Sequence, residues 1–268
     1  PILKIDSVSK RFGATQALNK VSFNVEKSEV IGLAGENGSG KSTLIKILCG
    51  VHQADSGRIV FMGKAHAPDT PAKTEKAGIS VFHQEIPICY NMSVAENVSL
   101  GNRMPVKHGM PDKKFMVLET KRLFRDLLDE PIDATRLMRN CTVAERQMAL
   151  LVRALRKSAA LVILDEPTSG LDPLIQNHLF DILNEENQKG TTIFFSSHVL
   201  SDVEKFCHRV AFIKDGRIVN EDDINSLKEK LLSRITYWLK EGKDDITLQT
   251  PGVISVEQYK NSTSFLYK

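Results

Sequence analysis

The 268-residue chain is poor in aromatic residues, cysteine and long apolar runs, and each shortage excludes a class of protein. Its longest apolar run, Ala159 to Leu164, has six residues, whereas a membrane-spanning helix needs roughly 20. The four cysteines form no Cys-x-x-Cys pair, so we expect plain thiols in a reducing compartment and no zinc site. The chain opens on an alternating strand pattern, which is unlike a signal peptide.

The chain also lacks a large excess of either sign of charge. There are 36 Lys and Arg against 33 Asp and Glu, a formal net charge of +3, and the two signs alternate along the chain. A nucleic-acid-binding protein usually concentrates basic residues on one face, so we expect no nucleic-acid partner. With 41% hydrophobic and 26% charged residues, the composition is that of an ordinary globular protein long enough for a full core.

The order of the expected elements is that of an α/β protein with a mostly parallel sheet, because strands alternate with helices. Two strands around Gly13 predict an N-terminal antiparallel β subdomain. Short apolar runs predict further strands at 30–34, 59–62, 79–82, 161–164, 192–195 and 210–213. Helical patterns are expected at 41–48, 175–186 and 200–206.

We expect two domains. Residues 1–225 form the larger one, and a helical subdomain is inserted into it at about 93–157, where leucine and phenylalanine recur every three to four residues. Residues 226–268 read as a small α+β extension, which we expect to be truncated because its last strand pattern stops at the chain end. That extension should contain a helix at 226–232 and strands at 235–239, 246–248, 253–259 and 264–267.

One motif predicts phosphate binding. Residues 35–42 fit G-x-x-x-x-G-K-[ST] between an expected strand and an expected helix. In such a loop the backbone N–H groups bind phosphate oxygens, the lysine reaches the β- and γ-phosphates, and the hydroxyl that follows holds Mg²⁺. The predicted nucleotide contacts are therefore Gly35, Glu36, Asn37, Gly38, Ser39, Gly40, Lys41, Ser42 and the next residue, Thr43.

Two acidic residues follow the apolar strand at 161–164. Asp165 stands at the carboxyl end of that strand, where a carboxylate beside a phosphate loop can hold the metal. Glu166 comes next and can orient or deprotonate a water that attacks the γ-phosphorus. An Asp-Glu pair is common at strand ends, and only its place in a chain with residues 35–42 gives it this meaning.

Together these motifs resemble the nucleotide-binding cassette of an ATP-binding-cassette (ABC) transporter, over about residues 2–222. The resemblance implies a P-loop NTPase fold and adds further roles. Phe12 matches the aromatic residue that stacks on adenine, and Gln84 matches the glutamine that senses Mg²⁺ and the attacking water. Asp172 ends a Ser-Gly-Leu-Asp segment that matches the loop crossing to a partner cassette, and His198 matches the histidine that contacts the γ-phosphate.

The segment that matches the family's Leu-Ser-Gly-Gly-Gln signature departs from it. Here it reads Cys-Thr-Val-Ala-Glu from Cys141 to Glu145. Thr142 keeps the hydroxyl and Ala144 replaces the second glycine, the two positions that contact the γ-phosphate held by the opposite cassette. Val143 adds bulk and Glu145 adds negative charge, which weakens the expected composite site.

The resemblance implies an ATPase that uses ATP and Mg²⁺, forms a homo- or heterodimer with a second cassette, and drives a separate transmembrane permease. It also implies a cytoplasmic location on the inner face of the cell membrane. Residues 30–100 resemble ribose- or galactose-type importer cassettes and residues 164–232 resemble exporter-type single cassettes, so a hybrid chain is one alternative. Others are a degenerate cassette that binds nucleotide without turnover, and a soluble ABC ATPase without a transport role.

Overall fold

The chain divides into two compact units, Pro1–Glu221 and Asp222–Lys268. In the computed structural model, the described residues are 1–82, 88–100, 104–107, 109–128, 132–156, 159–230, 233–238, 253–259 and 262–267. The boundary between the units falls inside strand β12 (Arg217–Asp223). The sequence pattern places the domain boundary a few residues further on, after residue 225.

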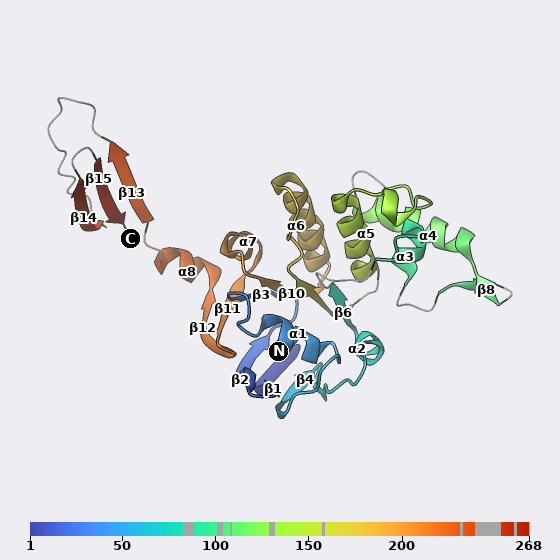
Figure 1. Ribbon diagram of the computed structural model, residues 1–268, viewed down its shortest axis with the longest axis horizontal. Coiled ribbons are helices and arrows are strands. Elements are labelled where there is room, and N and C mark those ends of the chain that lie inside the picture. The colour runs from blue at the N-terminus through green and yellow to red at the C-terminus, as the bar shows by residue number, and fades with distance from the viewer. Residues whose placement is uncertain are drawn as a thin grey trace. The chain divides into compact units, whose positions relative to one another are not determined.

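An antiparallel sheet opens the first unit, as the strands on either side of Gly13 predict (Figure 1). Its strand order is β2-β1-β4-β5. Side chains alternate between buried and exposed along β1, so one face of the sheet packs on the core. The four strands are β1 (Leu3–Phe12), β2 (Thr15–Val25), β4 (Ser56–Phe61) and β5 (Lys64–Ala65).

A six-stranded sheet forms the centre of the same unit, with the order β12-β11-β3-β10-β9-β6. Neighbouring strands from β11 to β6 run parallel. The residues of β3, β9 and β10 are all buried, as expected of strands covered on both faces. These strands are β3 (Val30–Ala34), β6 (Ile79–Phe82), β9 (Leu161–Asp165), β10 (Thr192–Ser197) and β11 (Arg209–Lys214).

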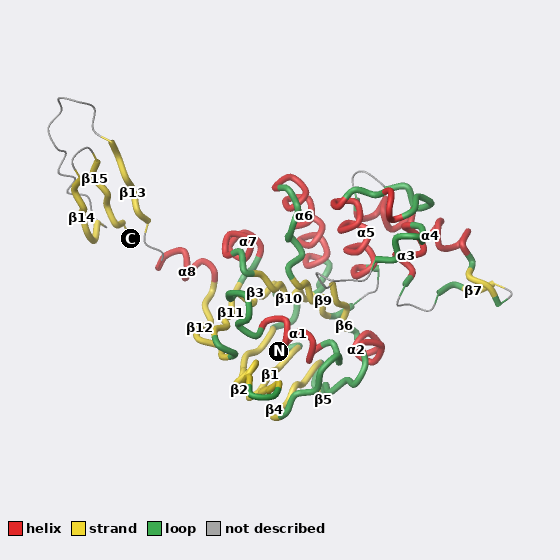
Figure 2. The backbone as a smooth tube through the Cα atoms, viewed as in Figure 1, coloured by secondary structure: helices red, strands yellow, loops and turns green. Residues whose placement is uncertain are grey.

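Helices cover both faces of this central sheet (Figure 2). Helix α1 (Lys41–Leu48) contacts both β2 and β9, and its buried residues join one core with both sheets. On the other face, α6 (Pro173–Gln188) and α7 (Leu200–Phe206) meet β10 through Phe180, Phe195 and Phe206, whose ring centroids lie 5.3–6.0 Å apart. The sheet is therefore fixed on both sides, and the loops at its carboxyl edge have a rigid base.

The inserted subdomain is helical, as expected, and it also contains a small hairpin that the sequence pattern did not indicate. A small hairpin precedes its longest helix, and two-residue strands leave no periodic pattern to read. The subdomain's elements are α3 (Val94–Ser99), β7 (Val106–Lys107), β8 (Met110–Pro111), α4 (Lys113–Leu127), a 3₁₀ turn (Met138–Asn140) and α5 (Val143–Leu155). The sequence pattern also missed α2 (Pro71–Ala77), which starts at a proline and ends at Gly78 in a left-handed conformation.

The second unit contains α8 (Ile224–Lys230) and a three-stranded antiparallel sheet with the order β13-β15-β14. The strands are β13 (Ser233–Trp238), β14 (Val253–Tyr259) and β15 (Ser262–Tyr267). The strand expected at 246–248 lies outside the described residues. No described helix is both long and apolar enough to cross a bilayer.

Candidate active site

The loop at residues 35–42 connects β3 to α1, as its motif predicts. Gly40 caps α1 with a φ of 111°, a conformation that an L-residue rarely adopts. A Cβ at Gly40 would lie 2.7 Å from the Ala17 carbonyl oxygen, and a Cβ at Gly35 would lie 2.4 Å from that of Ile213. Gly38 also has a positive φ, but a Cβ there would meet nothing within 4 Å. Two of the three glycines are thus required by the protein's own backbone, independently of any phosphate.

Lys41 is buried and folded back onto its own loop. Its Nζ donates hydrogen bonds to the Gly35 carbonyl at 2.6 Å and the Glu36 carbonyl at 3.1 Å. The same nitrogen lies 3.8 Å from Glu166 Oε1. A phosphate group entering the loop would therefore meet an ammonium already held at the centre of the site.

Glu166 is brought beside Lys41 by an unusual backbone conformation. Its φ is 50°, and its N–H donates to the Ser196 carbonyl at 2.9 Å. Left-handed conformations are uncommon for residues other than glycine and often occur at functional sites. The carboxylate lies 2.8 Å from His198 Nδ1 and 3.5 Å from Ser197 Oγ. Glu166 is buried whereas His198 is half-exposed, so the carboxylate is held between an internal lysine and an accessible imidazole.

Asp165 has chemistry suited to a cation. It is buried at the end of β9, and its Oδ1 has no hydrogen-bond partner, which is costly for a buried carboxylate. Burial, and then the charge of Glu166, raise the pKa of this carboxyl. Ser42 is exposed in the first turn of α1. No group of three His, Cys, Asp or Glu within the described ranges can hold a metal alone. A metal here would depend on Asp165, Ser42 and phosphate oxygens, a donor set that fits Mg²⁺.

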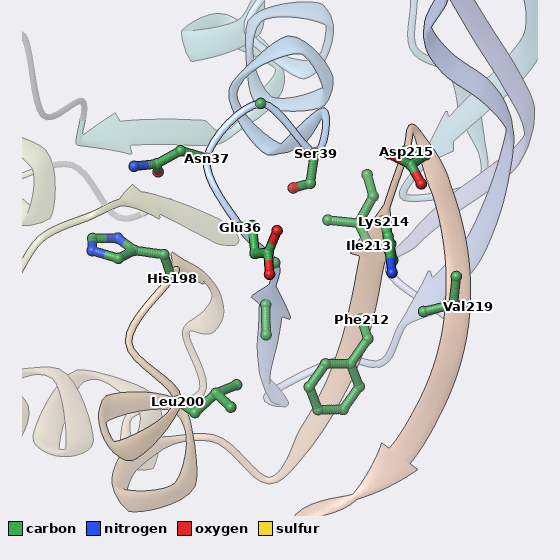
Figure 3. A pocket seen from close by; sticks show the side chains of 13 residues that line it. Glu36, Asn37, Ser39, His198, Leu200, Phe212, Ile213, Lys214, Asp215 and Val219 are labelled. Carbon is green, nitrogen blue, oxygen red and sulfur yellow. The ribbon is translucent and has the colours of Figure 1, made fainter.

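A cavity of about 520 Å³ adjoins the loop (Figure 3). Glu36, Asn37 and Ser39 line it from the P-loop, and His198 and residues of α7, β11 and β12 complete the wall. Ser39 is buried and its Oγ has no partner. The wall residues that the sequence pattern did not single out are Leu200, Phe212, Ile213, Lys214, Asp215 and Val219. In the sequence this region was marked only by the helix expected at 200–206 and the strand expected at 210–213, and by no motif of a site.

Phe12, the expected adenine partner, is 43% exposed at the end of β1. Its ring meets the His52 ring edge to face at 5.2 Å, and Lys10 Nζ lies 5.5 Å from its centre. The ring thus has one supported side and enough exposed surface to stack on a base. Thr43, in contrast, is partly buried in the first turn of α1.

Two other expected nucleotide contacts are helix caps. The Asp172 carboxylate accepts hydrogen bonds from the N–H groups of Leu174 and Ile175 at the start of α6. The Thr142 hydroxyl accepts one from the Glu145 N–H at the start of α5, and Ala144 follows in the first turn. None of the contacts of Lys41, Glu166 or His198 given above involves these two loops. Gln84, expected at the metal and the attacking water, lies outside the described residues.

The family model described as "ABC transporter" matches residues 18–169, more than half of the chain. The chain belongs to the ABC transporter family. A second model, described as "AAA domain, putative AbiEii toxin, Type IV TA system", matches only residues 145–200 of the cassette.

Sequence relatives of the cassette are named as importer ATPases. It is 36% identical over 277 residues to a ribose import ATP-binding protein RbsA of Clostridium perfringens, covering 100% of the chain and 55% of that protein. It is 35% identical over 226 residues to a galactose/methyl galactoside import ATP-binding protein MglA 2 of Photobacterium profundum, covering 84% and 44%. The chain thus spans about half the length of the curated relatives it matches.

Solved cassettes share the fold. An ATP-binding cassette of an ABC transporter in its ADP conformation superposes with a TM-score of 0.76 at 28% identity, covering 85% of this chain and 93% of that one. A dimeric cassette in a post-hydrolysis state, bound to ADP and Pi, superposes with a TM-score of 0.72 at 20% identity, covering 83% and 98%. The expected P-loop NTPase fold and the expected likeness to sugar-importer cassettes are confirmed. The exporter-like character of residues 164–232 stays a prediction.

Proposed function

We propose that this cassette binds and hydrolyses Mg-ATP and drives a membrane importer through a separate permease. The observation that carries the proposal is the convergence of three groups beside the P-loop. The Glu166 carboxylate lies 3.8 Å from Lys41 Nζ and 2.8 Å from His198 Nδ1. Next to it stands the buried, unpartnered Oδ1 of Asp165. A phosphate-binding loop alone would explain binding, whereas this carboxylate also supports hydrolysis.

Each group has a task set by charge. Phosphoryl transfer spreads negative charge over the γ-phosphate oxygens, which backbone amides and a lysine stabilise. Lys41 would exchange its bonds to the Gly35 and Glu36 carbonyls for phosphate oxygens. Glu166 would then be free to orient the attacking water, and His198 would hold the reacting phosphoryl group. Ser42 and Asp165 would hold Mg²⁺, which supplies neutralisation of phosphate charge when it is bound.

The complete site requires a second cassette. Helix α5, which Thr142 caps, packs on α3 and α4 of its own subdomain and on β6 of the central sheet. In the family that this chain belongs to, the corresponding loop serves the nucleotide of the opposite cassette, as does the loop ending at Asp172. A second copy, or another cassette, would therefore bring Thr142 and Ala144 to the γ-phosphate bound here.

The importer role rests on the relatives, whose names state ribose or galactose import. Such subunits act with a permease, so we place this cassette on the inner face of the cell membrane. Gln84 and the inserted subdomain would transmit closure of the cassette pair to that permease.

The test is phosphate release from the purified chain with Mg-ATP, measured across protein concentration. We expect turnover that rises with the square of protein concentration at the low end and is lost in Glu166→Gln. Glu166→Gln should still bind ATP and should accumulate as a dimer. Glu185→Gln, an exposed residue of α6, is the matched control and should keep the parent rate. Parent-rate hydrolysis by Glu166→Gln would refute the role of Glu166. ATP binding without turnover by the parent chain would refute the hydrolytic function.

A further inference from the structure

Both carboxylate oxygens of Glu145, the acidic residue in the altered signature segment, accept hydrogen bonds within the chain. Glu145 Oε2 accepts a hydrogen bond from the Thr142 N–H at 2.7 Å, and the Thr142 hydroxyl accepts one from the Glu145 N–H at 3.2 Å. This is a capping box, the reciprocal pairing that begins many helices. The other carboxylate oxygen, Oε1, accepts from the Arg136 guanidinium. Both oxygens of Glu145 are thus turned toward partners on the same subdomain.

The Thr142 N–H and Arg136 together outweigh the burial of this carboxylate. Both side chains are about one-third exposed or less. Partial burial pushes the pKa of Glu145 upward, but the Thr142 N–H and the guanidinium prevail and hold that pKa below its ordinary value. The pair with Glu145 also raises the pKa of Arg136. Glu145 therefore stays ionised, and its charge is compensated by an adjacent cation.

The start of α5 stays open to an anion under this arrangement. The first N–H groups of a helix have no acceptor within it, and the positive end of the helix dipole adds to their pull on an anion. The Glu145 N–H is used by the cap, which leaves those of Val143 and Ala144. Val143 is 58% exposed, so this helix end faces outward. The Thr142 hydroxyl accepts the Glu145 N–H in the cap and is also bonded to the Glu145 carboxylate.

We propose that Arg136 is a positioning residue, which holds Glu145 in the cap and cancels its charge, so that the start of α5 can receive the γ-phosphate of ATP bound by a second cassette. This role rests on the proposed function and deepens it. Without Arg136, an uncompensated carboxylate would stand one turn from an incoming phosphate. The altered signature segment therefore depends on a residue outside it, because Glu145 needs Arg136, nine positions earlier, as its partner.

A double-mutant cycle tests the pairing. Arg136→Gln should lower kcat by about tenfold or more, the range for loss of a hydrogen bond to a charged group, and leave the KM for ATP nearly unchanged. Glu145→Gln keeps the capping box, because glutamine also serves at that position, but it removes the negative charge, so loss of Arg136 should no longer lower kcat in that background. The variant that carries both Arg136→Gln and Glu145→Gln should have the same kcat as Glu145→Gln alone. Once position 145 has no charge, Arg136 has nothing to compensate.

Controls separate this role from folding and from general positive charge. Arg139→Gln removes the same charge from an exposed neighbour and should leave kcat unchanged. Arg136→Lys should recover part of the loss, and thermal unfolding of each variant reports the fold. An equal loss of kcat from Arg136→Gln in both backgrounds would overturn the proposal in favour of a structural role. An equal loss in Arg139→Gln would overturn it in favour of general charge.

The same measurements distinguish failure of this inference from failure of the proposed function. Turnover by the parent chain, and ATP-dependent dimer formation by Glu166→Gln, test the proposed function alone. If both are absent, that function fails and this role fails with it. If both are present, only the comparison of Arg136→Gln in the two backgrounds decides the role of Arg136.

Discussion

Replacing a glycine of the P-loop by alanine should have two different consequences, depending on which glycine is replaced. Gly40 has a φ of 111°, and a Cβ there would lie 2.7 Å from the Ala17 carbonyl oxygen and 2.9 Å from Leu18 Cδ2. A left-handed conformation costs a non-glycine residue about 1–2 kcal/mol, and overpacking adds about 1–3 kcal/mol. Gly40→Ala should therefore lower the free energy of unfolding by about 2–5 kcal/mol.

Gly38→Ala is the matched comparison. Its φ of 81° carries the same kind of backbone cost, but a Cβ would meet no atom within 4 Å. We expect a loss of about 1–2 kcal/mol from the backbone alone. Because Gly38 lies at the exposed turn of the loop, its methyl group should instead obstruct a bound phosphate and weaken ATP binding.

Urea unfolding of the two variants without nucleotide measures their difference in free energy of unfolding. Titration with ATP measures the loss of ATP affinity expected in Gly38→Ala. The midpoint should fall much further in Gly40→Ala than in Gly38→Ala, with similar slopes. Equal midpoints would refute this prediction, because they would mean that the clash with the Ala17 carbonyl adds nothing to the loss of stability. If Gly38→Ala binds ATP as tightly as the parent chain, the phosphate does not lie against Gly38.

Two further predictions concern buried groups away from the loop. Thr168 Oγ1 donates to the Asp202 carboxylate at 2.6 Å, and both are buried, so Thr168→Val should lower the free energy of unfolding by about 1.5–3 kcal/mol, the value of a hydrogen bond to a charged group. Urea unfolding beside the exposed control Thr135→Val tests this, and equal losses would contradict it. Alkylation at pH 8 followed by peptide mass spectrometry should modify the partly buried Cys89 before Cys49. Burial, and then Asp165, raise the pKa of Cys49 to about 12, which leaves about one molecule in 10⁴ as thiolate. Equal rates at the two cysteines would show that Cys49 is open to solvent.

The parts of the fold that the sequence predicted well have strong local signals. Helix α1 spans Lys41–Leu48 as expected, because a glycine-lysine step follows a buried apolar strand. Helix α7 also has the expected bounds, Leu200–Phe206. The strands of the parallel sheet were found because burial on both faces demands continuous apolar runs. The hairpin at residues 106–111 was missed because two paired residues on each side leave no periodicity.

The expected site residues differ in how far the sequence could define their surroundings. The P-loop motif predicts where Lys41 stands, but its bonds to the Gly35 and Glu36 carbonyls depend on how the loop folds. Contacts between distant segments had no local signal at all, as with His198 and Glu166, which are 32 positions apart. The capping box at Thr142 and Glu145 could have been read from its spacing, S/T-x-x-E. Arg136, which completes it, could not.

The adjacent acids Asp165 and Glu166 illustrate why a dipeptide cannot define a site. In an extended strand, neighbouring side chains point to opposite faces, so a continued strand would carry Asp165 and Glu166 to opposite sides of the sheet. Here β9 ends at Asp165, and the left-handed φ of Glu166 turns the chain at once. Glu166 is thereby carried to Lys41 and His198, whereas Asp165 keeps an unpartnered oxygen. The backbone thus separates a carboxylate held by Lys41 and His198, suited to orienting water, from one that keeps an unpartnered oxygen, suited to a cation.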